Sequence, residues 1–307
     1  MGAVLGAAIG DALGHPTEFL SWDGIEQRYG ANGVQDYVLF WEADGVSFAP
    51  YTDDTQMAEQ VFRALENSRR SNLNLEKSME LLAERFVQWS RDPQGGHRAP
   101  GRACLAGCRA LAEGQPWFEA GAENAGGCGS VMRAYPFGLF FHSDLYQAET
   151  WAVAQSKLTH RDPIALAACA AMAVGTALFL RKEAPSKVFP RMCARADAYS
   201  RATGNMMRKA YDEAIQGVPP RTTLDRLRGW AAHEAIAAAV YVAARHPEDP
   251  RIALLEAVNT PGDSDSLGTL VGALLGARLG EHAFPLHWRQ QLERQNELVA
   301  MAQSLLD

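Results

Sequence analysis

Several features that mark particular classes of protein are scarce in this 307-residue sequence. There is no long run of basic residues and the formal net charge is −7, so the chain lacks the positive surface that binds a nucleic-acid backbone. The five cysteines are odd in number and scattered, which favours reduced thiols over a disulfide framework. We therefore expect a cytoplasmic protein whose main partner is not nucleic acid.

Short signatures of common hydrolases and metal proteins are also missing. No GxSxG pattern occurs, and His233-Glu234 is not followed by a second histidine at position 237, which argues against serine hydrolases and zinc proteases of the HExxH type. Neither a Walker A pattern nor a dinucleotide-binding glycine pattern is present. Cys104 and Cys108 stand four apart, but no second Cys or His pair accompanies them, so a structural zinc site is not expected.

The apolar residues are arranged for helices rather than strands. Met57, Val61 and Leu65 recur at four-residue spacing, and no convincing alternating pattern appears. The stretch 164–180 is uncharged but rich in alanine and at the short limit for a membrane span, so we interpret it as a buried core helix and expect no membrane role. Hydrophobic residues make up 47% of the chain and no interdomain linker is evident, which predicts a single all-helical domain over residues 1–307.

Two segments repeat glycine at every fourth residue, which gives a predicted helix one smooth face. These glycines are Gly2, Gly6, Gly10 and Gly14 in the first segment and Gly268, Gly272, Gly276 and Gly280 in the second. A helical glycine costs about 1 kcal/mol relative to alanine, so the repeats predict two core helices whose backbones pack closely. If these helices are antiparallel, Glu18 lies beside the acidic loop 262–266.

Two pairs of aspartates stand immediately before predicted helices. Asp53 and Asp54 precede an amphipathic pattern; one of them could serve as a helix cap, but the second needs another role. Asp263 and Asp265 are two residues apart, so in an extended segment they point to one side and can share a cation. An EF-hand loop is excluded there, because Leu274 stands where that loop needs a bidentate glutamate.

A metal centre is predicted if the two aspartate pairs meet in the fold. Four aspartates in one pocket would repel one another by about 4 kcal/mol for each close pair at an effective dielectric near 20, so cations must accompany them. Oxygen ligands with no convergent histidine or cysteine favour Mg²⁺ or Mn²⁺ over Zn²⁺.

The third segment of interest is the glycine-rich loop 126–133. Such a loop can present backbone N–H groups to a phosphate, although a plain tight turn is the simpler interpretation of this loop by itself. His160 stands shortly before the apolar stretch 164–180. Taken alone, we interpret it as a cap or a surface group rather than a catalyst.

Five short motifs, spread over nearly the whole chain, are informative in combination. They are Gly10-Asp11-Ala12-Leu13-Gly14 with Glu18, Thr52-Asp53-Asp54-Thr55-Gln56-Met57, Gly127-Cys128-Gly129-Ser130-Val131-Met132-Arg133, Leu158-Thr159-His160 and Gly262-Asp263-Ser264-Asp265-Ser266-Leu267-Gly268. In this order they resemble the ADP-ribosylglycohydrolase family. The resemblance implies an orthogonal all-helical fold, a binuclear Mg²⁺ or Mn²⁺ centre and hydrolysis of the glycosidic bond between ADP-ribose and a modified macromolecule.

The resemblance also implies roles for individual residues. The implied metal ligands are Thr52, Asp53, Asp54, Asp263, Asp265 and Ser266. The implied contacts to the diphosphate of ADP-ribose are Gly127, Cys128, Gly129 and Ser130. His160 is implied to contact the sugar-phosphate region, and Glu18 to lie near the scissile bond on a mobile segment. Either Glu18 or Asp54 could serve as general base.

Two positions depart from the pattern of many relatives. Ser266 stands where many carry threonine, so the hydroxyl ligand is kept but the methyl group that restricts its rotamer is lost, and metal affinity is expected to be lower. Cys128 is familiar in the bacterial branch but absent from others. The acceptor preferences of the animal enzymes are therefore not transferred to this chain.

Three functions are compatible with the resemblance. The first is release of ADP-ribose from an ADP-ribosylated protein, with arginine as the expected acceptor. The second is hydrolysis of a small ADP-ribosyl or nucleotide-like metabolite, and the third is a binding protein that has kept the fold without catalysis. The complete set of candidate metal ligands argues against the third. A monomer is the working expectation, although the sequence does not fix the oligomeric state.

Overall fold

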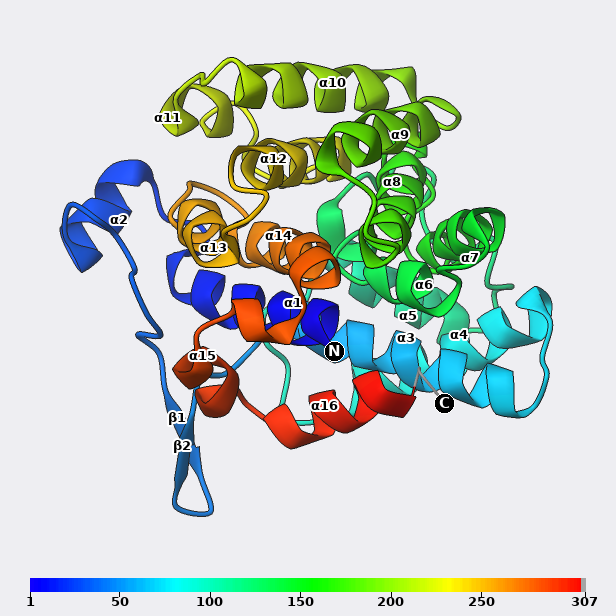
Figure 1. Ribbon diagram of the computed structural model, residues 1–307. Helices are drawn as coiled ribbons and strands as arrows, with labels where there is room; N and C mark the ends of the chain where they lie inside the picture. Colours follow the sequence, from blue (N-terminus) through cyan, green and yellow to red (C-terminus); the bar gives the residue numbers. More distant parts are fainter. Residues whose placement is uncertain (305–307) are drawn as a thin grey trace.

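The computed structural model describes residues 1–304, and its regular secondary structure is almost entirely helical (Figure 1). The α-helices are α1 (Gly2–Gly14), α2 (Trp22–Tyr29), α3 (Asp53–Arg70), α4 (Leu75–Arg91), α5 (Arg102–Ala112), α6 (Tyr135–Phe140), α7 (Leu145–Lys157), α8 (Pro163–Leu180), α9 (Pro185–Asp197), α10 (Arg201–Ile215), α11 (Pro220–Leu224), α12 (Ala232–Arg245), α13 (Pro250–Val258), α14 (Ser264–Leu279), α15 (Leu286–Gln291) and α16 (Gln295–Ser304). Short 3₁₀ segments are η1 (His15–Thr17), η2 (Cys128–Ser130) and η3 (Glu281–Ala283). The all-helical class predicted from the sequence is confirmed.

Helices α1 and α14 pack side by side at the centre of the molecule (Figure 1). All residues of α1 are buried. A Cβ atom added to Gly10 would lie 2.0 Å from the carbonyl oxygen of Gly268, and one added to Gly272 would lie 1.9 Å from that of Gly6. Residue numbers rise along one helix as they fall along the other, so the two helices are antiparallel. The close backbone packing predicted from the glycine repeats is therefore present.

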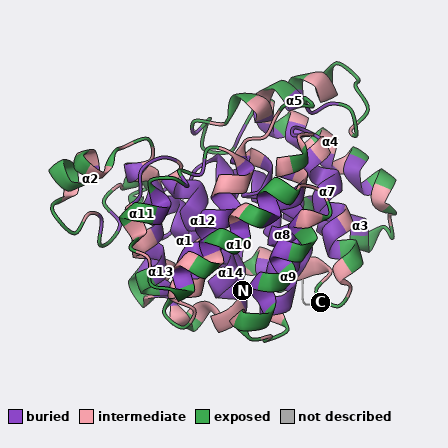
Figure 2. Ribbon diagram, turned by 90° about the horizontal axis from the view of Figure 1, so that it is seen from above, coloured by how far each residue is buried: buried purple, intermediate pink, exposed green. Residues whose placement is uncertain are grey.

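Helix α8 belongs to the buried interior, together with α12 and α14 (Figure 2). It is long and apolar enough to cross a membrane, yet 78% of its 18-residue window is buried inside the fold. A helix in the core of a folded protein is mostly buried in this way. The interpretation of the stretch 164–180 as a core helix is confirmed.

A small β-hairpin was not predicted from the sequence, which showed no convincing alternating pattern. Strands β1 (Trp41–Ala43) and β2 (Val46–Phe48) pair antiparallel and extend away from the helical body (Figure 1). Asp44 and Gly45 join them with φ angles of 51° and 74°, the left-handed conformations that a two-residue hairpin turn requires. The Asp44-Gly45 pair was the sequence feature that could have predicted the hairpin turn. The strands are too short and too exposed to show an alternating pattern.

Gly272→Ala should destabilise the fold strongly, because its Cβ would collide with backbone that cannot move without separating α1 from α14. We expect the free energy of unfolding to fall by roughly 3 kcal/mol or more, the upper range for overpacking a core. Gly24→Ala, in α2, is the control: the atom nearest to its Cβ would be the Ser21 hydroxyl at 3.3 Å, and the change should stay within about 1 kcal/mol. Urea unfolding measures both; equal effects would contradict the packing argument.

Candidate active site

The segments predicted to carry the site meet in one cleft of about 610 Å³. The predicted residues that line it are Glu18, Asp53, Asp54, Gly127, Cys128, Gly129, His160, Asp263, Asp265 and Ser266. Thr52 and Ser130 are not among the lining residues, and 1% and 0% of their surface is exposed. The Ser130 hydroxyl is occupied there by hydrogen bonds from Ser156 and Cys169. Its side chain therefore supports the glycine loop from behind.

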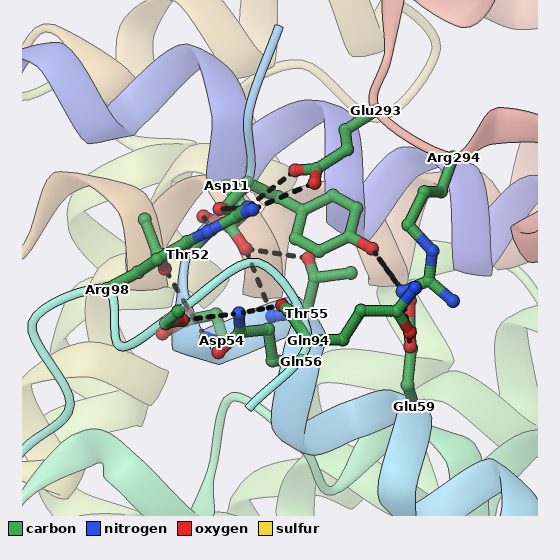
Figure 3. Close-up of polar contacts among 12 residues, drawn as sticks. Asp11, Thr52, Asp54, Thr55, Gln56, Glu59, Gln94, Arg98, Glu293 and Arg294 are labelled. Carbon is green, nitrogen blue, oxygen red and sulfur yellow. Dashed lines mark hydrogen bonds and ion pairs between the residues drawn. The ribbon is translucent and has the colours of Figure 1, made fainter. Parts of the chain in front are cut away.

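Side chains other than the two adjacent aspartates cap the N-terminus of α3. The hydroxyl of Thr52 accepts a hydrogen bond from the Asp54 N–H at 3.3 Å. Asp11, fully buried in α1, accepts bonds from the N–H groups of Thr52 at 2.9 Å and Thr55 at 3.0 Å, and from the Thr55 hydroxyl at 2.6 Å (Figure 3). Because these bonds satisfy the free N–H groups of the helix, the carboxylates of Asp53 and Asp54 are not needed as caps.

The loop that follows α1 is tied to the loop that precedes α14. The Thr17 hydroxyl bonds the Ser264 hydroxyl at 3.1 Å, and the Phe19 N–H donates to the Gly262 carbonyl at 2.9 Å. Phe19 has a φ of 64°, an uncommon conformation for a large side chain, which turns the chain at this point. These contacts hold Glu18 beside the acidic loop, as the antiparallel packing of the glycine helices predicted.

Burial drives the clustered carboxyl groups toward their protonated forms. It raises the pKa of Glu18 to about 8 and that of Asp53 to about 7, and repulsion from neighbouring carboxylates adds to both shifts. The same causes raise the pKa values of Asp54 and Asp265 well above their usual range. Oδ2 of Asp54 is buried and has no hydrogen-bond partner. A divalent cation would provide that partner and favour the charged carboxylates, so these residues fit a metal ion.

One histidine joins the carboxylates, so the prediction that no histidine converges on them is wrong. A ring nitrogen of His15, a carboxylate oxygen of Glu18 and one of Asp265 all lie within 4.8 Å of one another. His15 and Asp265 are far apart in the sequence, and only the packing of α1 against α14 brings them together. The available signal was the position of His15, directly after the glycine helix and three residues before Glu18.

Comparison with known proteins identifies the chain. The family model described as ADP-ribosylglycohydrolase matches residues 1–307. The chain belongs to the ADP-ribosylglycohydrolase family. It is 25% identical to the ADP-ribosyl-[dinitrogen reductase] glycohydrolase of Rhodospirillum rubrum, with 97% of this chain and 91% of that protein covered. It is 27% identical to the ADP-ribosylarginine hydrolase Tri1 of Pseudomonas putida, with 100% and 77% covered.

A solved structure described as an ADP-ribosylglycohydrolase-related protein complex has the same fold. The two align with a TM-score of 0.72 and 25% sequence identity, covering 99% of this chain and 95% of the other. Membership of the ADP-ribosylglycohydrolase family makes this protein a hydrolase of that type.

The glycine loop of this ADP-ribosylglycohydrolase is held from behind by a buried arginine. Arg133 has no exposed surface, and its guanidinium donates hydrogen bonds to the Gly129 carbonyl at 2.7 Å and to the Thr159 hydroxyl at 2.6 Å. It also lies over the ring of Phe86, with 4.5 Å from Cζ to the ring centroid. Arg133 ends the glycine-rich motif 127–133, but the sequence predicts no role for it, because nothing in the sequence shows that its charge points inward.

His160 is buried and faces the glycine loop, so its interpretation as a cap or surface group is wrong. Its Nδ1 lies 2.7 Å from the Thr159 hydroxyl. That hydroxyl accepts a bond from Arg133 and has one proton that it can donate to Nδ1; in that arrangement the proton of a neutral imidazole is on Nε2. Burial, reinforced by Arg133, lowers the pKa of His160 to about 3, so the ring is neutral at physiological pH. Nε2 lies beside Gly127 and Gly129, where this tautomer offers an N–H donor to the cleft.

Asp11→Asn should weaken the link between α1 and α3, because an amide turned toward Thr55 offers a donor where an acceptor is required. We expect the free energy of unfolding to fall by about 1–3 kcal/mol, the cost of leaving buried donors unsatisfied. The matched control is Asp144→Asn at the partly exposed N-cap of α7, where Asn caps as well as Asp and little change is expected. Equal stability of the two variants in urea would contradict the assigned role of Asp11.

The raised pKa values predict that metal-free protein loses stability as the pH rises. Glu18 and Asp53 have folded-state pKa values of about 8 and 7, against 4.5 and 3.8 for the free groups. The folded state therefore binds more protons, and stability falls as these groups ionise. His15 and His160, whose pKa values are lowered, affect stability only below about 6.5, the ordinary pKa of histidine.

The unfolding temperature in EDTA should accordingly fall between pH 6.5 and pH 8. Added Mg²⁺ or Mn²⁺ should reduce that fall, because a bound cation favours the ionised carboxylates. Differential scanning calorimetry at three pH values measures both effects. A flat or rising unfolding temperature in EDTA over this range would contradict the electrostatic description of the cleft.

Proposed function

We propose that this protein is a metal-dependent hydrolase that releases ADP-ribose from an ADP-ribosylated protein, with arginine as the acceptor residue. The observation that carries the proposal is the convergence of buried carboxylates, with an unpartnered oxygen on Asp54, on a cleft whose other wall is a glycine loop. The relatives named for ADP-ribosyl-[dinitrogen reductase] and for ADP-ribosylarginine support a protein substrate and an arginine linkage.

We assign two divalent cations, Mg²⁺ or Mn²⁺, to the acidic end of the cleft. The residues that would hold them are Thr52, Asp53, Asp54, Asp263, Asp265 and Ser266. When bound, such cations lower the pKa of a water molecule and orient ribose hydroxyl groups. The backbone N–H of Ser266 donates to Oδ1 of Asp265 at 2.9 Å, which fixes that carboxylate at the start of α14.

The opposite wall suits the diphosphate of ADP-ribose. Gly127, Cys128 and Gly129 bring backbone to the cleft with little side-chain bulk, and the Nε2–H of His160 adds a neutral donor beside them. A neutral donor can bind a phosphate oxygen without itself needing a counter-charge. The distribution of groups then orients the substrate, with phosphates at the glycine loop and the ribose at the carboxylates.

Glu18 is the better of the two candidates for proton transfer. Asp54 is 3% exposed, fixed in the first turn of α3 and suited to hold a cation. Glu18 is only partly buried and lies in the loop after α1, at the edge of the cleft. It can therefore reach a water molecule that approaches the anomeric carbon. The clustered carboxylates would stabilise the positive charge that develops on the ribose ring in the transition state.

Asp54→Ala and Asp263→Ala should lose nearly all turnover, by about 10³-fold or more, because each removes a ligand and a stabilising charge. The assay measures free ADP-ribose released from arginine-ADP-ribosylated protein in Mg²⁺ or Mn²⁺, before and after EDTA. Asp212→Ala, an exposed position in α10, is the control and should keep full activity. Helical circular dichroism should be retained in all three. Unchanged turnover in either cleft variant would contradict the proposal.

The same assay on small ADP-ribosyl-arginine separates the protein substrate from a small metabolite. Faster turnover, measured as kcat/KM, on the modified protein supports the proposed function, whereas activity on the small conjugate alone supports the alternative. Cytoplasmic location and a monomeric state stay predictions from the sequence.

A further inference from the structure

The first turn after α1 carries an imidazole that the mechanism above does not use. His15 opens the 3₁₀ segment η1, and its Nδ1 is buried without a hydrogen-bond partner. One of its ring nitrogens lies within 4.8 Å of a carboxylate oxygen of Glu18 and of one of Asp265. The unpartnered Nδ1 leaves the imidazole with an unused lone pair or an unused donor, and two carboxylates lie close to the same ring.

The spacing of these three groups is compatible with a shared metal ion. Ligand atoms bound at about 2.0–2.2 Å from one cation lie roughly 3–4 Å from each other, depending on whether they are neighbours or opposite. A separation of up to 4.8 Å closes to that range with small side-chain rotations. His15 and Glu18 share one short loop, and Asp265 stands on the adjacent helix.

The backbone around this trio is held in place by contacts already described. The Thr17 hydroxyl bonds Ser264, and the Phe19 N–H bonds Gly262, so the loop that carries His15 cannot drift away from α14. A Cβ atom on Gly14, directly before His15, would lie 2.5 Å from the Cα of Asp265. Close approach of the two backbones at Gly14 therefore brings the imidazole within reach of the carboxylate.

We propose that His15 is a nitrogen ligand of the divalent metal centre, acting with Asp265 at one of its two positions, beside Glu18. The inference rests on the proposed function for the existence of the centre. The assignment of His15 makes the two metal positions different. Asp53, Asp54 and Asp263 provide only oxygen ligands at one position, whereas His15 and Asp265 provide nitrogen and oxygen ligands at the other.

This asymmetry has a chemical consequence for metal choice. Mg²⁺ prefers oxygen ligands in strict octahedral geometry, whereas imidazole suits transition-metal ions. The His15 position therefore selects a transition-metal ion such as Mn²⁺ over Mg²⁺, while the oxygen-only position accepts either. His15 is in this way a residue that determines the metal specificity of the protein.

Pulsed electron paramagnetic resonance of Mn²⁺ tests the assignment without any measurement of activity. Metal-free protein receives excess Mg²⁺ and less than one equivalent of Mn²⁺, so that Mn²⁺ collects where it is preferred. We expect coupling to ¹⁴N in the unsubstituted protein and in the control His97→Ala, an exposed histidine outside the cleft. The coupling should vanish in His15→Ala. The preference for Mn²⁺ over Mg²⁺ in calorimetric titrations should fall about tenfold or more, in line with the loss of a ligand interaction.

His15→Gln separates ligation from packing, because it keeps much of the volume and supplies an oxygen. It should fold like the unsubstituted protein, bind Mn²⁺ and lack the ¹⁴N coupling. Mn²⁺ binding without ¹⁴N coupling in the unsubstituted protein would overturn the role of His15 and leave the proposed hydrolase standing. Coupling that persists in His15→Ala would also overturn it. No binding of either metal would overturn both proposals.

Discussion

The contact of glycine on glycine between α1 and α14 is the constraint on which the rest of the structure depends. At Gly10 and Gly268 the two backbones are so close that no Cβ atom fits between them. This approach requires seven of the eight repeated glycines, since Gly280 is the C-cap of α14 and a Cβ there would meet no atom. A glycine inside a helix costs about 1 kcal/mol relative to alanine. Dispersion between tightly packed backbones offsets that cost. The close packing also fixes the positions of the helix ends. The loop after α1 carries Glu18, and the first turn of α14 carries Asp265.

A second link joins this pair to α3. Asp11 is the only charged residue of α1, and it is fully buried. Burial raises its pKa to about 6, while hydrogen bonds from Thr55 and Thr52 oppose the rise. An isolated carboxylate would be costly in this position, but these donors at the start of α3 stabilise it. The carboxylate thereby fixes the first turn of α3 against α1 and leaves Asp53 and Asp54 free to face the cleft.

The cleft is divided by charge as a result of these two links. Carboxylates from three segments crowd one end, where their mutual repulsion and burial create a need for cations. The other end has glycine backbone and a neutral imidazole, held by Arg133 from behind. Arg133 is too deeply buried to meet the substrate, so its charge acts through the loop and through Thr159. A substrate with a diphosphate at one end and a ribose at the other matches this division.

Much of the architecture was determined by the sequence itself. The four-residue spacing of apolar side chains and of glycines fixes helices and their smooth faces, because these are periodic properties of a single segment. The five cysteines, predicted to be reduced, are all free and buried. The order of the short motifs was enough to identify the family, and the aspartate pairs were enough to single out the carboxylates of the cleft.

The tertiary structure alone decided which side chains share a cleft and which way they point. His15 and Asp265 meet only because α1 packs antiparallel to α14, a relation between segments that no local pattern encodes. The capping role of Asp11 could not be predicted, since the sequence does not show that its carboxylate reaches the backbone of Thr52. Burial likewise made His160, an expected surface group, a neutral imidazole inside the fold. Local periodicity is a property of one continuous segment, whereas desolvation, hydrogen-bond partners and pKa values depend on neighbours that come together only on folding.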